Sequence, residues 1–212
     1  QGQALCPMTT GISHHVGQID EIRAGILCAL FPQAPVTGHN GEHICDYLDG
    51  ADPSVVLINP PFTASPNRES LNRHAGASHL RSALLGLRPG GRLVAVTLAS
   101  FEPAARAWSE TWEELGRIAT LRLSISLPGG VFNAAGAGVK TNLLFFNKGE
   151  PTEKIWYYDL SDVKVGKRQP FTLDKFDDFF HLLPKRADGE RSWTVDFAKR
   201  KQQATAEADP LK

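Results

Sequence analysis

Four consecutive residues, Asn59-Pro60-Pro61-Phe62, directly follow the apolar run Val55-Val56-Leu57-Ile58 and have the chemistry to hold an amine. The lone pair of an exocyclic ring amine is delocalised, so its attack on a methyl sulfonium requires that the amine be held and aimed. The Asn59 side-chain oxygen and the Pro60 carbonyl can each accept one amine N–H, while the Phe62 ring can stack on a base turned out of its helix. Pro60 and Pro61 fix φ and so pre-position these acceptors.

The same tetrapeptide also has a purely structural interpretation, because Asn-Pro and Pro-Pro commonly end a strand and begin a turn. Its position favours the functional interpretation. In open α/β sheets, ligands bind at the carboxyl ends of strands, and a tetrapeptide that directly follows a buried strand must lie there. We therefore expect Asn59, Pro60, Pro61 and Phe62 to form a binding site for the reacting amine.

The elements that position this site follow from the spacing of apolar residues. The sequence predicts helices around residues 20–31, 42–49, 80–87 and 103–116, and strands near residues 35–39, 54–58, 93–98, 118–127 and 141–147. Arg88-Pro89-Gly90-Gly91 ends the third of these helices. The polar segment up to about residue 75 is too long for a simple connection, so it is a candidate substrate loop. Alternating strands and helices predict a parallel or mostly parallel sheet with helices on both faces.

Aromatic residues dominate the last third of the chain. Trp156, Tyr157 and Tyr158 fall on a predicted strand, where core or edge packing is a better explanation than base stacking. Phe176, Phe179, Phe180 and Leu183 recur at helical spacing and predict a packing face against the sheet or a partner chain. We expect residues 1–160 to form the catalytic domain, residues 161–198 an extension that packs on it or on a partner, and residues 199–212 a polar tail.

The composition is that of a single enzyme domain with a sizeable core. The 212 residues include 23 Lys plus Arg and 23 Asp plus Glu, so no overall basic field attracts nucleic acid. Three cysteines without zinc-ligand spacing indicate reduced thiols, and no apolar stretch is long enough to span a membrane. We expect a cytoplasmic protein, and a fragment or processed product because the chain begins at Gln1.

Two groups of stretches resemble known families. Three stretches between Ile19 and about Trp108 resemble the methylase portion of strawberry-notch-like helicase/methyltransferase proteins. They are Glu21-Ile22-Arg23-Ala24, Leu30-Phe31-Pro32 and Pro53-Ser54-Val55-Val56-Leu57-Ile58-Asn59-Pro60-Pro61-Phe62. Three further stretches, between about Ile118 and Lys199, resemble the modification subunit of type I restriction systems. They are Leu127-Pro128-Gly129-Gly130-Val131-Phe132, Gly138-Val139-Lys140-Thr141-Asn142-Leu143-Leu144-Phe145-Phe146 and Ile155-Trp156-Tyr157-Tyr158-Asp159-Leu160.

These resemblances imply an N6-adenine DNA methyltransferase with a Rossmann-like α/β fold that uses S-adenosylmethionine. DNA is then the substrate, within a restriction-modification or related system. Type I modification subunits borrow base recognition from a separate specificity subunit, so a specificity subunit or a longer parent protein is the implied partner. On the same basis we expect the isolated chain to bind duplex DNA weakly and without sequence preference.

This chain matches the family's cofactor-binding residues less completely. The glycine-rich turn corresponds to Cys6-Pro7-Met8-Thr9-Thr10-Gly11, which has one glycine, Gly11. The acid that binds the ribose hydroxyls corresponds to Asp20 or Glu21, of which Glu21 matches better, although an acid in the first turn of a helix has a purely structural explanation. The acid that accepts from the adenine amine of the cofactor corresponds to the neutral Asn40. The alternative function is therefore a degenerate, non-catalytic subunit that acts as an interaction module. A third, an RNA or protein-glutamine methyltransferase, would use the same tetrapeptide.

Other motifs support no separate function. Gly136-Ala137-Gly138-Val139-Lys140-Thr141 resembles a phosphate-binding loop, but Val139 replaces the glycine before the lysine and a strand follows where a helix should. His14, His15, His39 and His43 lack metal-ligand spacing. Lys140 and Asn142 can contact a DNA phosphate, although an exposed loop lysine is more often simply solvated.

Overall fold

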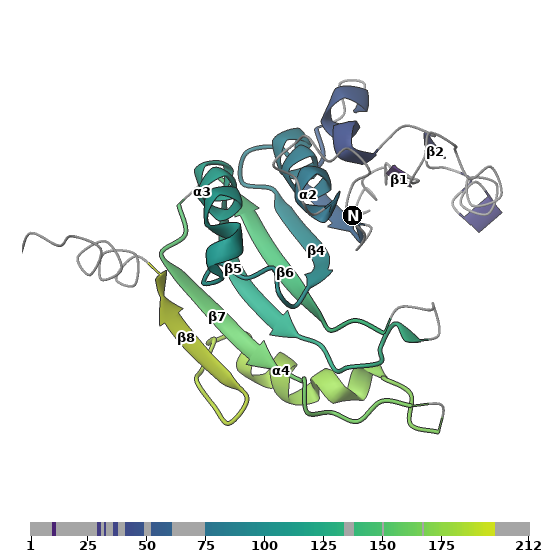
Figure 1. Cartoon of the computed structure of the whole chain (residues 1–212), viewed down its shortest axis with the longest axis vertical. Coiled ribbons are helices and arrows are strands. Elements are labelled where there is room, and N and C mark those ends of the chain that lie inside the picture. Colours follow the sequence, from purple (N-terminus) through teal and green to yellow (C-terminus); the bar gives the residue numbers. More distant parts are fainter. Residues whose placement is uncertain are drawn as a thin grey trace, which may run out of the picture. The chain divides into compact units, whose positions relative to one another are not determined.

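The computed structural model describes residues 10–11, 29–30, 32, 36–37, 41–48, 52–60, 75–133, 138–149, 151–166 and 168–197. Two short strands, β1 (Thr10–Gly11) and β2 (Val36–Thr37), pair in parallel. A six-stranded sheet has the order β3-β4-β6-β5-β7-β8 (Figure 1). Its strands are β3 (Val55–Ile58), β4 (Arg92–Leu98), β5 (Ala119–Ser126), β6 (Thr141–Lys148), β7 (Lys154–Asp159) and β8 (Ser192–Asp196).

The expectation of a mostly parallel sheet is wrong, because the six-stranded sheet is mixed. The pairs β3/β4 and β5/β7 are parallel, whereas β7 and β8 are antiparallel. The loop between β5 and β6 contains no described α-helix, and the Leu127 N–H donates to the Thr141 carbonyl at 2.9 Å where one strand ends and the other begins. A direct return of this kind reverses the chain, since only a crossover connection keeps neighbouring strands parallel.

The chain divides into two compact units, Gln1–Thr97 with Asn147–Gly149, and Leu98–Phe146 with Glu150–Lys212. In the first unit, η1 (Gly41–Tyr47), two short 3-10 turns separated by a kink at His43, packs on helix α2 (Ala75–Gly86). The core face of α2 and the residue that follows it are the expected ones, with Leu80, Ala83, Leu84 and Leu87 all at most 2% exposed. The helical spacing of these residues in the sequence therefore identified the buried face.

A tight turn separates α2 from β4, as the sequence predicts. The Gly91 N–H donates to the Arg88 carbonyl at 2.9 Å, with Pro89 and Gly90 in the central positions and φ of Gly90 at +71°. Proline followed by a glycine of positive φ is the pattern of a type II turn. This turn allows β4 to begin directly beside β3, in a register that pairs Val55 with Arg92 and Ile58 with Ala95.

Lys148 anchors the carboxyl end of α2. Its Nζ donates to the carbonyl oxygens of Leu85 and Leu87 at 2.6 and 2.5 Å, where a helix has unpaired carbonyls and a partial negative charge. We expect Lys148→Met to lower the free energy of unfolding by about 1–2 kcal/mol. Lys154→Met, on an exposed β7 residue, is the matched control and should change it by less than about 0.5 kcal/mol. Urea titration followed by circular dichroism measures both, and equal effects would contradict the capping role.

Strand β3 departs from the expectation of a buried strand. Its alternate residues Val55 and Leu57 are 52% and 71% exposed, while Val56 and Ile58 on the other face are half-buried. β3 is the edge strand of the six-stranded sheet, so among the described residues it pairs with another strand, β4, on one side only.

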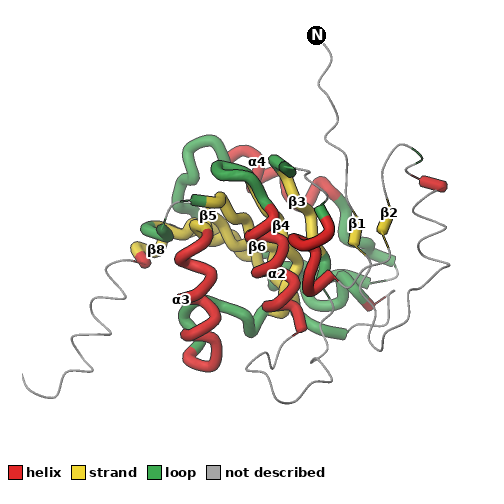
Figure 2. Tube along the Cα trace, turned by 90° about the horizontal axis from the view of Figure 1, so that it is seen from above, coloured by secondary structure: helices red, strands yellow, loops and turns green. Residues whose placement is uncertain are grey.

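The second unit has helices on both faces of its strands, as expected. Helix α3 (Ser109–Ile118) covers one face, where Trp112 stacks on Phe146 with ring centroids 6.0 Å apart. The adjacent residue on β6, Phe145, points to the other face and packs in the cluster that includes Phe179 of α4 (Asp177–Leu182). Figure 2 shows α3 and α4 on opposite sides of β5. The helix expected at 103–116 begins only at Ser109, after the short 3-10 helix η2 (Arg106–Trp108).

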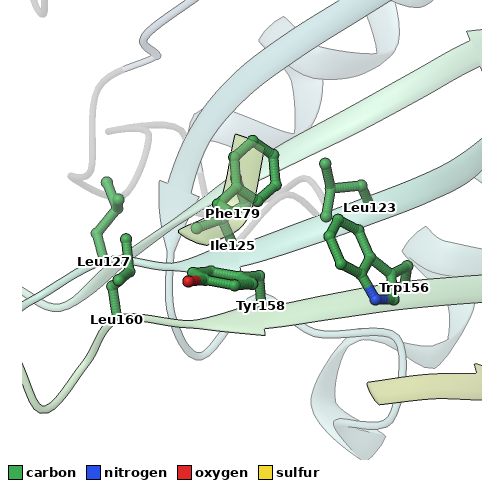
Figure 3. Packing of buried hydrophobic residues seen from close by; sticks show 7 residues of the cluster. All are labelled: Leu123, Ile125, Leu127, Trp156, Tyr158, Leu160 and Phe179. Atoms are coloured by element: carbon green, nitrogen blue, oxygen red, sulfur yellow. The ribbon is translucent and has the colours of Figure 1, made fainter. Parts of the chain in front are cut away.

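An aromatic cluster forms the core beneath α4. It joins residues of β5, β7 and α4 and the residues that follow the two strands, shown in Figure 3: Leu123, Ile125, Leu127, Trp156, Tyr158, Leu160 and Phe179. The adjoining 3-10 helix η4 (Leu173–Phe176) contributes Phe176, whose ring lies 6.0 Å from that of Phe179. Packing of Trp156 and Tyr158 in the core is confirmed. The helical face of phenylalanines also packs on the sheet, although Phe180 remains 50% exposed.

Within this cluster, the side-chain hydroxyl of Tyr158 forms a hydrogen bond to α4. Its hydroxyl donates to Asp178 Oδ2 at 2.9 Å, and burial followed by that carboxylate raises the pKa of Tyr158 from 10.0 to about 12. A folded-state pKa above the unfolded value means that the contribution to stability is complete below about pH 10 and is lost as the pH rises towards about 12. We expect the unfolding free energy of the parent to fall more steeply over this interval than that of Tyr158→Phe. Parallel pH dependences of the two proteins in urea titrations would contradict this.

No helix among the described residues is long and apolar enough to cross a membrane.

Candidate functional site

The candidate site lies at the carboxyl ends of β3 and β4, in the first unit. The parallel register pairs Ile58 with Ala95, so Asn59 and Pro60 continue past the last paired residue of β3. The Arg92 N–H donates to the Ser54 carbonyl at 2.9 Å, and the same alternation carried up the ladder would require an N–H at residue 60 to reach the Val96 carbonyl. Proline has no N–H, so Pro60 explains why β3 ends at Ile58.

Asn59 and Pro60 differ in exposure in the way that the proposed chemistry requires. The Asn59 side chain is exposed, and none of the described residues hydrogen-bonds to it, so its amide oxygen can accept from a ligand. Pro60 is buried, which holds the backbone of this segment in place. Among the described residues, the Asn59 side chain is therefore an unoccupied acceptor next to a buried proline. No Lys or Arg occurs between Ser54 and Pro60.

The other expected site residues are less well placed by the structure. Pro61, Phe62, Asp20, Glu21 and Asn40 lie outside the described residues. Gly11 lies in strand β1, with Thr37 of β2 as its register partner, instead of in the turn after a strand that the resemblance implied. The structure thus brings Asn59 and Pro60 to one strand end, and the cofactor residues stay a prediction.

Thr97 is a polar residue at this strand end that the sequence interpretation missed. It belongs to β4, is 5% exposed, and its Oγ1 finds no hydrogen-bond partner among the described residues. The run from Leu93 to Leu98 reads as an apolar strand, and a threonine within it suggests only β-propensity. A signal was nevertheless available, because Thr97 is the only hydroxyl residue in Arg92–Leu98.

A further pair of polar side chains, Cys45 and Ser82, has a structural role. The Cys45 N–H donates to Ser82 Oγ at 3.1 Å, and the Ser82 hydroxyl donates to Cys45 Sγ at 3.2 Å, which ties η1 to α2. Cys45 is a free thiol. Within the described part of the chain, no group of three His, Cys, Asp or Glu side chains could hold a metal ion.

The glycine-rich segment between β5 and β6 does not offer the pair of phosphate contacts considered above. Lys140 is exposed, but Asn142 is 1% exposed and its amide is buried without a partner among the described residues. Asn142 therefore cannot reach a phosphate at the surface in this conformation. The strand that begins at Thr141 also agrees with rejecting a phosphate-binding loop, which needs a helix at that position.

Comparison with known proteins shows similarity to methylase subunits of type I restriction enzymes. Over 183 residues the chain is 31% identical to the methylase subunit of the type I restriction enzyme StySPI from Salmonella potsdam, covering 75% of this chain and 33% of that subunit. It is 36% identical over 160 residues to the EcoEI methylase subunit from Escherichia coli, covering 70% of this chain and 31% of that subunit. The chain thus spans about a third of the length of these curated relatives. No protein-family model matches the chain.

Solved structures agree on the fold. A protein from Vibrio vulnificus assigned as the modification subunit of a type I restriction enzyme superposes with a TM-score of 0.73 at 20% identity, over 90% of this chain and 43% of that one. A protein from Listeria monocytogenes assigned as a class I S-adenosylmethionine-dependent methyltransferase superposes with a TM-score of 0.61 at 13% identity, over 85% of this chain and 55% of that one. At these identities the superpositions establish the fold alone.

Proposed function

Because the chain is partly homologous to the methylase subunits of type I restriction enzymes, we propose that it transfers a methyl group from S-adenosylmethionine to the N6 amine of adenine in DNA. The observation that carries this proposal is the Asn59-Pro60 segment at the carboxyl end of β3, where an exposed asparagine, to which no described residue hydrogen-bonds, precedes a buried proline. This chemistry requires two acceptors in fixed positions, and this segment supplies both on one short piece of backbone.

The chain's own residues bind and orient the target in this mechanism. The Asn59 side-chain oxygen and the Pro60 carbonyl each accept one N–H of the adenine amine, which localises the nitrogen lone pair and aims it in line with the methyl group. Phe62 stacks on the adenine ring after the base has turned out of the duplex. The methylated amine is cationic and loses its proton readily, so no strong general base is needed. When bound, S-adenosylmethionine supplies the electrophilic methyl group.

The cofactor site is part of the same proposal. Gly11, Asp20 or Glu21, and Asn40 are the residues that would hold S-adenosylmethionine, by correspondence with the family's motifs. A single glycine and a neutral Asn40 give fewer contacts than a complete site, so we expect its affinity for the cofactor to be reduced. Losing one hydrogen bond to a charged acceptor weakens binding by about tenfold or more.

DNA recognition by this chain is proposed to depend on a partner. The formal net charge of the chain is zero, and phosphate contacts require clustered Lys and Arg. A specificity subunit, or the rest of a longer parent protein, would then supply affinity and sequence selection. Supporting this is the fact that the chain spans about a third of its curated relatives.

The test is incorporation of labelled methyl groups. The purified chain is incubated with S-adenosylmethionine labelled in the methyl group and with duplex DNA at high concentration, and the DNA is then hydrolysed to nucleosides. We expect label in N6-methyl-2′-deoxyadenosine, and none from a duplex in which every adenine is already N6-methylated. Absence of label, together with no S-adenosylmethionine binding by calorimetry, would refute the proposal in favour of a non-catalytic interaction module.

A further inference from the structure

The segment η4–α4 carries apolar residues around more of its surface than the sheet covers. Phe179 is 4% exposed and packs in the cluster beneath α4, whereas Leu173 and Phe180 are 73% and 50% exposed. Residues three apart are aligned in a 3-10 helix, and residues four apart share a face in an α-helix. Leu173, Phe176 and Phe180 therefore form one stripe beside the core-facing side, here named the apolar stripe.

The apolar stripe is a continuous surface. The centroid of the Phe176 ring lies 6.2 Å from that of Phe180 and 5.4 Å from that of Phe171. Single exposed apolar residues are ordinary on protein surfaces, but adjacent ones mark binding surfaces. From the rise per residue of the two helix types, the stripe is about 12 Å long. An amphipathic helix that presents residues i, i+3 or i+4, and i+7 covers about the same length.

Acidic side chains border the apolar stripe. Asp174 and Asp177 each follow a stripe residue in the chain, and both are exposed. Asp174 pairs with Lys175 at 2.6 Å, whereas the Asp177 side chain has no hydrogen bond or ion pair within the part of the chain that the structure describes. Acids near a helix start also stabilise the helix, but they keep the charge that they present outwards.

This charge selects the kind of partner. DNA phosphates and anionic lipid headgroups are both repelled by carboxylates, so neither nucleic acid nor a membrane surface complements the border of the stripe. A protein surface that carries Lys or Arg beside its apolar residues does complement it. Aromatic residues are enriched in the cores of protein interfaces, and two of the three stripe residues are phenylalanines.

We propose that the apolar stripe is the docking site for an amphipathic helix of a partner protein, whose apolar residues cover the stripe and whose Lys or Arg side chains pair with Asp174 and Asp177. This inference rests on the proposed dependence of the chain on a partner, and it names the surface that the partner covers. The partner helix lies along η4 and α4, and it excludes water from the exposed sides of Leu173 and Phe180.

Three fluorescent synthetic peptides of about 18 residues test the site, a length that forms roughly five helical turns. The first has Leu at i, i+3 or i+4, and i+7 with Lys on the flanks, the second has Glu in place of Lys, and the third has Ala in place of Leu. Fluorescence anisotropy measures their binding to the full chain at physiological salt. We expect the first peptide to bind at least about tenfold more tightly than the other two, since only it matches both the apolar surface and the charge.

Variants of the chain locate the binding. Leu173→Ser should weaken the first peptide about tenfold without lowering the melting temperature, because this side chain is 73% exposed. Asp177→Asn should weaken it about threefold, with the difference lost at high salt. Trp193→Ala is the matched control, since Trp193 is an exposed aromatic residue on β8, outside the stripe, and its loss should change the affinity by less than about twofold.

Each result supports or overturns the docking site. Equal affinity of the parent and Leu173→Ser for the first peptide would refute it, and so would equal affinity of the parent for the Lys and Glu peptides. If Leu173→Ser weakened binding of duplex DNA, the stripe would contact nucleic acid and the assignment of a protein partner would be wrong. The peptide titrations contain neither DNA nor methyl donor. A chain that methylates adenine but binds no peptide refutes the docking site alone, and one that binds the first peptide but transfers no methyl group refutes the proposed activity alone.

Discussion

Asn59→Ala is expected to lower kcat for methyl transfer by about 100-fold or more, with no change in the melting temperature of the chain. The Asn59 side chain is exposed and contacts none of the described residues by a hydrogen bond, so its removal leaves no buried group unpaired. Its contribution to the reaction lies in localising the amine lone pair, which matters most in the transition state. Initial rates of labelled methyl transfer at saturating DNA and cofactor measure the effect.

Asn59→Asp is the matched control for this experiment. Aspartate has the same shape and retains an oxygen that accepts an amine N–H, so it should keep far more activity than alanine. The two variants together separate loss of the acceptor from loss of the amide. If Asn59→Ala retained the parental rate, Asn59 would not orient the amine and the site would have to be placed elsewhere.

Trp156→Ala is expected to destabilise the chain by about 3–5 kcal/mol, which is enough to unfold a marginally stable protein at physiological temperature. Trp156 is 1% exposed at the centre of the cluster beneath α4, and its ring stacks on Phe179 with centroids 5.7 Å apart. Its Nε1 also donates to the Ala187 carbonyl at 3.3 Å, which fixes the segment after α4. The substitution therefore leaves a large cavity and removes a hydrogen bond.

Trp193→Ala provides the comparison within the same sheet. Trp193 stacks on Tyr157 with centroids 5.6 Å apart but is 43% exposed, so most of its ring already contacts solvent. We expect a loss of about 1 kcal/mol. Guanidinium titrations of both variants, followed by tryptophan fluorescence and circular dichroism, give the two values. A Trp156 variant as stable as the Trp193 variant would show that the cluster beneath α4 does not hold the second unit together.

Local periodicity was sufficient to locate most elements. The spacing of Leu80, Ala83, Leu84 and Leu87 identified α2 and its core face, because helical residues three and four apart share one side. Pro89 and Gly90 identified the turn after it, because proline fixes φ at a negative value and glycine readily adopts a positive φ. The start of the helix expected at 103–116 was misplaced, since a 3-10 turn and the first turn of an α-helix place apolar residues at similar intervals.

Strand direction and burial were beyond the reach of the sequence. The alternation of strands and helices predicted a mostly parallel sheet, but the segment between β5 and β6 returns directly and β7 pairs antiparallel with β8. The apolar run Val55–Ile58 predicted a buried strand, and yet Val55 and Leu57 are exposed. An apolar run shows only that a strand has apolar side chains available for burial. Which neighbours cover it depends on the order of strands, and that order is set by contacts between residues far apart in the chain.

The sequence by itself determined the chemistry of the candidate site, because Asn59 and the prolines after it carry their acceptors and their rigidity wherever the chain places them. Tertiary structure alone decided which residues stand beside that segment. The parallel register of β3 and β4 pairs Ile58 with Ala95, although 36 residues separate them in the chain. Two residues further along β4, the fold buries Thr97, a hydroxyl that the sequence shows only as one more β-branched residue. Such neighbours are set by hydrogen bonds between backbones, and the pattern of these bonds does not depend on side-chain identity.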